Sequence, residues 1–122
     1  MLSAMMPEPG SPDEVNRLWD LMCKGGPPPS TPHRIQFSLA CLSRATADFI
    51  AQYLEHSAEF TSTPPRPSVS DEGREYWDLE VISREEPLSL PFLQQTCATV
   101  RAAAVSFGCR LYTWGSYAEG AA

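Results

Sequence analysis

At 122 residues, the chain is long enough for one domain with a single core and too short for two. Its content of 43% hydrophobic and 20% charged residues is typical of a globular protein and excludes general disorder. The net charge of −6 opposes binding to a phosphate backbone, so nucleic acid is disfavoured as the main partner.

The sequence shows no sign of a membrane segment or of export. No run approaches the roughly 18 apolar residues that a membrane span needs. The opening stretch MLSAMMPEPG lacks the basic region and the long apolar region of a secretory signal. We therefore expect a cytoplasmic protein.

The first predicted element is a helix over residues 11–26. Ser11 is placed to cap it, Pro12 suits the first helical position, and Glu14 completes a capping box. Glycines at 25 and 26 end the helix. Its apolar stripe at helical spacing needs a covering surface and comprises Val15, Leu18, Trp19 and Met22.

The segments around this helix are expected to lack regular structure. Residues 1–10 are predicted to be a flexible N-terminus and residues 118–122 a C-terminal tail. Residues 27–33 contain four prolines, which fix φ and remove backbone donors, so they are predicted to form a stiff linker. The single domain thus spans residues 11–117, with its remaining elements in residues 34–117.

Residues 34–41 alternate between apolar and polar side chains and predict a half-buried strand, with Ile35, Phe37, Leu39 and Cys41 inward. A helix follows after a Ser43 cap, and its apolar side is expected to include Ala45, Phe49, Ile50, Tyr53 and Leu54. Residues 59–63 predict a short strand, and the proline-rich stretch after them predicts a loop or an exposed hairpin connection.

The second half of the chain repeats this order. Residues 75–86 alternate again, with Trp77, Leu79 and Val81 on one face and Tyr76, Asp78, Glu80 and Ile82 on the other. A Ser89 cap begins a helix that ends at Gly108, and its inner stripe comprises Leu93, Cys97, Val100 and Ala104. In the last strand, Cys109, Leu111 and Thr113 are expected to lie opposite Arg110, Tyr112 and Trp114.

This order predicts an α+β fold, the ferredoxin-like βαββαβ arrangement with an additional N-terminal helix. Two helices would cover one face of a four-stranded antiparallel sheet, and the last strand would lie at an edge beside the first. The expected core combines the inner strand faces with Phe49, Ile50, Leu54, Leu93, Cys97 and Val100. The opposite sheet face would be amphipathic.

The residues with chemical potential are scattered. The four cysteines form no C-x-x-C pair and have no histidine at metal-ligand spacing; they are Cys23, Cys41, Cys97 and Cys109. We interpret them as small buried thiols in a reducing compartment. No phosphate-binding loop, nucleophile elbow or carboxylate pair with a nearby base is found. The sequence therefore predicts no enzyme activity, no metal and no cofactor.

The leading helix DEVNRLWDLMCKGG and the last strand CRLYTWGSY resemble the RraB family, whose members end in a strand with a tyrosine, a Trp-Gly element and an aromatic residue. Here the specific element is Trp114-Gly115. The resemblance spans about residues 11–117. It implies a non-catalytic regulator, because the founding members inhibit ribonuclease E by binding its non-catalytic scaffold region and remodelling the RNA-degradation complex.

The resulting hypothesis is a protein-binding regulator whose partner is a ribonuclease E-like enzyme. The expected partner-binding residues are Tyr76, Asp78, Glu80, Arg110, Tyr112 and Trp114. Two alternatives stay open: an immunity-type or other binding module of the same fold, and a ligand-binding protein or enzyme with a pocket between sheet and leading helix. If the leading helix instead covers the open sheet face, Trp114 is a core residue. The oligomeric state is left open.

Overall fold

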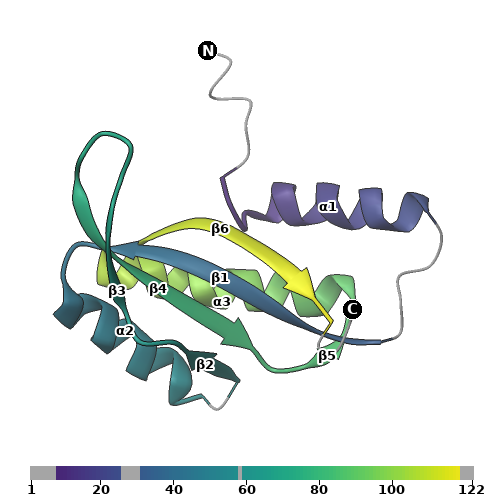
Figure 1. The fold of residues 1–122 in the computed structure, drawn as a ribbon. Helices are drawn as coiled ribbons and strands as arrows, with labels where there is room; N and C mark the ends of the chain where they lie inside the picture. The colour runs from purple at the N-terminus through teal and green to yellow at the C-terminus, as the bar shows by residue number, and fades with distance from the viewer. Residues whose placement is uncertain (1–7, 26–30, 58, 119–122) are drawn as a thin grey trace.

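A computed structural model describes residues 8–25, 31–57 and 59–118 (Figure 1). Parts of the expected N-terminus, linker and tail, namely residues 1–7, 26–30 and 119–122, lie outside the described residues. The elements in chain order are α1 (Pro12–Lys24), β1 (Pro32–Cys41), α2 (Arg44–Glu55), β2 (Phe60–Ser62), β3 (Arg66–Val69), β4 (Glu75–Ser83), β5 (Glu86–Pro87), α3 (Leu90–Phe107) and β6 (Arg110–Tyr117).

The fold is α+β, with three helices and one antiparallel sheet among the described residues. β1 lies between β4 and β6, and the far side of β4 pairs with both β2 and β3. β5 pairs with the first residues of β1. The sheet has six strands and not the expected four. One reason is the Pro64-Pro65 pair, which lacks backbone donors and divides one edge into β2 and β3.

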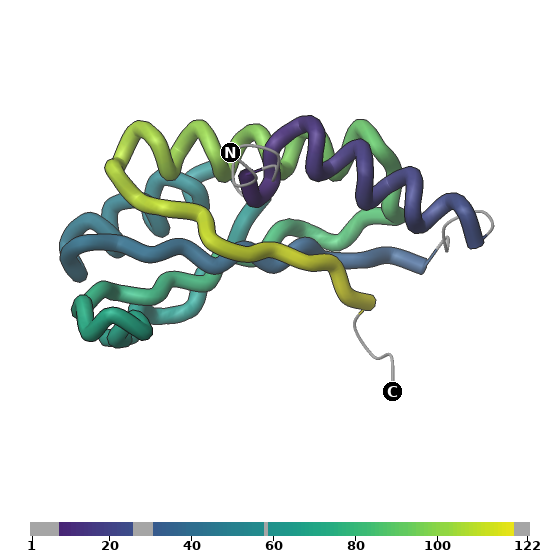
Figure 2. Tube along the Cα trace, turned by 90° about the horizontal axis from the view of Figure 1, so that it is seen from above, coloured from purple at the N-terminus to yellow at the C-terminus, as the bar shows by residue number. Residues whose placement is uncertain are grey.

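All three helices lie on one side of the sheet. Figure 2 shows α3 above the strands and α1 beside it, outside the edge formed by β6. α2 and α3 begin with the expected caps, since Ser43 accepts a hydrogen bond from the amide of Thr46 and Ser89 one from Phe92. Gly108 ends α3 with a left-handed φ of 69°, as the sequence predicted.

The core lies between the sheet and the layer formed by α2 and α3. Ile35, Phe37, Leu39 and Cys41 are fully buried, as the period-two pattern of β1 predicted. The expected inner stripe of α3 is also buried. Phe49 was wrongly assigned to the core, because 61% of its surface is exposed. The buried side of α2 is instead formed by Ala47, Ile50, Ala51 and Leu54.

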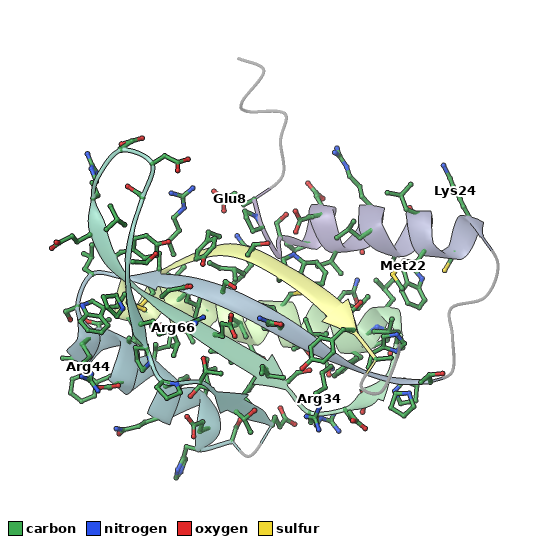
Figure 3. The ribbon with its side chains drawn as sticks, in the orientation of Figure 1. Glu8, Met22, Lys24, Arg34, Arg44 and Arg66 are labelled. Atoms are coloured by element: carbon green, nitrogen blue, oxygen red, sulfur yellow. The ribbon has the colours of Figure 1, made fainter. Side chains whose placement is uncertain are left out.

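The leading helix is anchored at its first turn. Ser11 accepts a hydrogen bond from the amide of Glu14, and the Glu14 carboxylate accepts one from the amide of Gly10 at 2.7 Å. Val15 is buried and Met22 packs against the core, whereas Leu18 is 39% exposed. Figure 3 shows Met22 on the side of α1 that faces the domain and Lys24 pointing away from it.

Two segments that were expected to lack regular contacts, the linker and the N-terminus, contact the domain at their ends. The linker was expected to include Pro32 and His33, but these residues begin β1 and pair with β5. At the N-terminus, Glu8 forms an ion pair with Arg101 at 3.0 Å. Gly10 has a φ of 73°, and a side chain there would meet Leu111 at 3.0 Å, so glycine suits this position.

Burial of Cys97 makes the stability of the fold depend on pH. Burial raises the pKa of this thiol from its ordinary value of 9.0 to about 12. A raised folded pKa contributes stability that is complete below pH 9.0 and is lost as the unfolded thiol ionises above it. The unfolding free energy of the wild type is therefore expected to fall as the pH rises above 9.0. In Cys97→Ala we expect this fall to be less steep by about 1.4 kcal/mol per pH unit. Urea unfolding of the wild type and of Cys97→Ala between about pH 9 and 11 measures the two slopes. An unchanged slope would contradict the prediction.

Candidate protein-binding surface

One face of the sheet carries no helix of the described chain. Figure 1 views this face directly, with α3 behind the strands. We call it the open face and define it by the residues that alternate with the core positions. They are Arg34, Gln36, Ser38 and Ala40 of β1, Arg66 and Ser68 of β3, Tyr76, Asp78, Glu80 and Ile82 of β4, and Arg110, Tyr112, Thr113, Gly115 and Tyr117 of β6.

The middle of the open face holds a tyrosine pair joined to a carboxylate. The Tyr112 hydroxyl donates a hydrogen bond of 2.7 Å to Asp78 Oδ1. The ring of Tyr76 meets the ring of Tyr112 edge to face, with 6.4 Å between centroids. Burial and then the Asp78 hydrogen bond raise the pKa of Tyr112, so its phenol stays a neutral donor near neutral pH. β4 and β6 thus place Tyr76, Asp78 and Tyr112 together, as the sequence predicted.

Charged residues surround this cluster. Glu80 pairs with Arg66 at 3.7 Å, and Figure 3 shows the Arg66 side chain extending from β3 across the sheet. Arg34 pairs with Glu85 at 3.6 Å and donates to the Ser83 carbonyl oxygen at 3.2 Å. Arg110 lies exposed opposite Ala40, at the other end of the face. Both signs of charge therefore border the tyrosines.

A bulge in β6 changes which side its residues face. Thr113 pairs with Ser38 and Leu111 pairs with Leu39, so Tyr112 has no partner of its own in the β1 register. The extra residue reverses the alternation after this point. Trp114 consequently lies opposite the core residue Phe37 and not beside Tyr112.

Trp114 belongs to the helical side of the sheet. Its ring stacks with Phe37, with centroids 6.3 Å apart and planes 20° apart. Its indole N–H donates a hydrogen bond to Glu14 of α1. The expectation that Trp114 shares a face with Arg110 and Tyr112 is therefore wrong. The alternative expectation was that Trp114 is internal because the leading helix covers the open face. Trp114 does pack on the core side, but α1 does not cover the open face (Figure 2).

The structure adds a hollow, and the residues that line it, to the predicted binding set. A shallow hollow of about 390 Å³ follows β6 beyond Tyr112 and is lined by Gln36, Ser38, Thr113, Trp114, Gly115, Ser116 and Tyr117. Nothing lies within 4 Å of the position that a Gly115 Cβ would take, so the missing side chain leaves this space open. An available signal was the TWGSY run, where a glycine between aromatics marks an unfilled position on the strand.

The groups of the open face are suited to binding by hydrogen bonds, ion pairs and aromatic contact. Phenols, carboxylates and guanidinium groups supply all three. Within residues 8–25, 31–57 and 59–118, no group of three or more histidine, cysteine or acidic side chains is arranged to hold a metal ion.

No described helix combines the length and the apolar character needed to cross a membrane. No protein-family model matches the sequence, and no curated protein matches it either.

Proposed function

We propose that this chain is a non-catalytic protein-binding regulator that binds its partner through the open face. The observation that carries the proposal is the Tyr76–Asp78–Tyr112 cluster on a sheet face with no described helix over it. One face of an antiparallel sheet commonly meets water, so exposure alone is weak support. The kind of side chain exposed gives stronger support. Tyrosines bury much area with few rotatable bonds and are enriched at protein interfaces.

The fold proposed for this function is ferredoxin-like. The strand order β2-β4-β1-β6, with α2 and α3 on one face, supports it if β2 and β3 together serve as one edge strand. Such a fold hosts many unrelated functions, so the regulator role depends on the surface and not on the topology.

The proposed partner is a ribonuclease E-like enzyme, bound through a basic segment of its non-catalytic region. The resemblance of the leading helix and of the Trp114-Gly115 strand to the RraB family supports the identity of the enzyme. The net charge of −6 supports the basic character of the segment. Asp78 and Glu80 place acidic groups in the middle of the face, where Glu80 pairs with Arg66, and Arg34 and Arg110 lie toward its ends.

The proposal predicts that Tyr112→Ala weakens partner binding at least tenfold, which is about 1.4 kcal/mol. The substitution removes the ring that contacts Tyr76 and the donor to Asp78. Isothermal titration of the chain against the purified non-catalytic region of ribonuclease E gives the affinity. A parallel RNA-cleavage assay with the full enzyme is expected to show slower cleavage when the wild-type chain is added.

The control is Phe49→Ala, which removes an exposed aromatic ring from α2 on the opposite side of the molecule. This variant is expected to bind like the wild type. A second variant, Gly115→Leu, fills the hollow on the open face without removing a contact and is expected to weaken binding. Equal affinities for the wild type, Tyr112→Ala and Gly115→Leu would show that the open face is not the binding surface. No binding of the wild type would exclude ribonuclease E as the partner.

A further inference from the structure

Two cysteines meet where β1 ends and β6 begins. Cys41 is the last residue of β1, and Cys109 directly precedes β6. Ala40 and Arg110 are paired in the antiparallel register, so the next position along the ladder places Cys41 opposite Cys109. Residues directly opposite each other in such a ladder have Cα atoms about 4.5–5.5 Å apart. This spacing falls within the range that a disulfide bond spans, roughly 4.4–6.8 Å.

The side chains of this pair also meet. Both cysteines are free, and the Cys109 Sγ donates to the Phe107 carbonyl oxygen at 3.8 Å. Each thiol also contributes to the pKa shift of the other, as neighbouring groups do. Burial is the main cause that raises the pKa of each thiol, so both are held in the protonated form near neutral pH.

The pair has one buried and one accessible member. Cys41 is fully buried, whereas Cys109 is only partly buried. Cys109 lines a surface hollow of about 280 Å³ together with Val105, Arg110 and Leu111. A small oxidant can therefore reach Cys109 first, and Cys41 is the thiol that the strand register places opposite it.

We propose that Cys41 and Cys109 form an oxidation site at which hydrogen peroxide produces an intramolecular disulfide bond. The Cys109 thiol loses its proton, and its sulfur attacks one peroxide oxygen to give a sulfenic acid, while the released hydroxide takes up the proton and leaves as water. The Cys41 sulfur then attacks the Cys109 sulfur and loses its proton, and the sulfenic hydroxyl leaves as a second water. Two thiols are oxidised, and one peroxide is reduced to two waters.

The bond would join the central strand β1 to the start of the edge strand β6. It closes a long loop that contains α2, β4 and α3, and cross-links over long loops restrict the unfolded chain most. We expect oxidation to raise the unfolding midpoint by about 5 °C or more, reversibly with dithiothreitol. The inference stands independently of the proposed partner.

The test uses the full chain with Cys23→Ser, because Cys23 is exposed and could link two molecules. After treatment with hydrogen peroxide, intact mass spectrometry is expected to show the loss of two hydrogen atoms. A digest without reduction is expected to link the peptides that contain Cys41 and Cys109. The reaction is expected to be faster at about pH 9 than at about pH 7, because the thiolate is the reactive form.

Two further variants make the result specific. In the Cys23→Ser background, adding Cys109→Ser is expected to abolish the mass loss, whereas adding Cys97→Ala is expected to leave it intact. Oxygen addition to a single cysteine without a cross-link would overturn the proposal. So would a disulfide that contains Cys97, or a mass loss that persists in the Cys109→Ser variant.

Discussion

Replacing Phe37 with alanine is expected to lower the free energy of unfolding by about 3–5 kcal/mol, the range for emptying a buried aromatic site. Phe37 is fully buried in the central strand, between β4 and β6, and it also supports the ring of Trp114. The cavity cannot collapse easily, because neighbours on both flanking strands are fixed by the sheet ladder. Urea unfolding followed by tryptophan fluorescence measures the loss.

Phe49→Ala is the matched control, because it removes the same side chain from a mostly exposed position on α2. Its cost is expected to stay below about 1 kcal/mol, as is usual for surface substitutions. If Phe49→Ala were as damaging as Phe37→Ala, the outer side of α2 would have to be packed against something, and the burial of this helix would be assigned wrongly.

Trp114→Ala is expected to cost about 2–4 kcal/mol of stability. The substitution removes the ring stacked on Phe37 and leaves the Glu14 carboxylate without its indole donor. Because that carboxylate also holds the amide of Gly10, the first turn of α1 should loosen. Hydrogen exchange of the α1 amides, compared with that of α3 amides, measures this loosening.

Trp114→Phe separates the contribution of ring stacking from that of the hydrogen bond to Glu14. It keeps an aromatic ring but lacks the N–H, so it is expected to lose only about 1.5–3 kcal/mol, the usual value for a hydrogen bond to a charged group. Tyr117→Ala, on the same strand but more exposed, is expected to cost less than either change at Trp114. Wild-type stability in Trp114→Ala would contradict the placement of this side chain between β6 and α1.

The elements of this fold were predictable where a local signal dominated. Ser11, Ser43 and Ser89 cap their helices because a serine side chain satisfies an amide that the first turn leaves unpaired. The inner face of β1 followed from strict alternation. Phe49 shows that hydrophobicity alone does not predict which side of a helix is buried. A helix that packs closely on a sheet can bury small residues such as Ala47 and Ala51 and leave a large ring outside.

The candidate site was predictable only in part, because a bulge has no clear signature in one sequence. Strict alternation placed Tyr112 and Trp114 on the same face, whereas one unpaired residue moved Trp114 to the other face. Leu111 and Trp114 both pack on the core side although they are three residues apart, an odd spacing that regular alternation forbids. The position of α1 beside α3 depends on long-range contacts such as that between Asn16 and Gln94, which periodicity cannot reveal.

The central claim is that a partner protein binds the open face through Tyr112, while Trp114 serves the fold. The most direct test is quantitative affinity capture from the source cell with three immobilised chains: the wild type, Tyr112→Ala and Phe49→Ala. The account predicts that the wild type and Phe49→Ala retain the same partner in equal amounts, and that Tyr112→Ala retains at least tenfold less. Equal retention by Tyr112→Ala, with loss by Phe49→Ala, would contradict the account and place the binding surface on the helical layer.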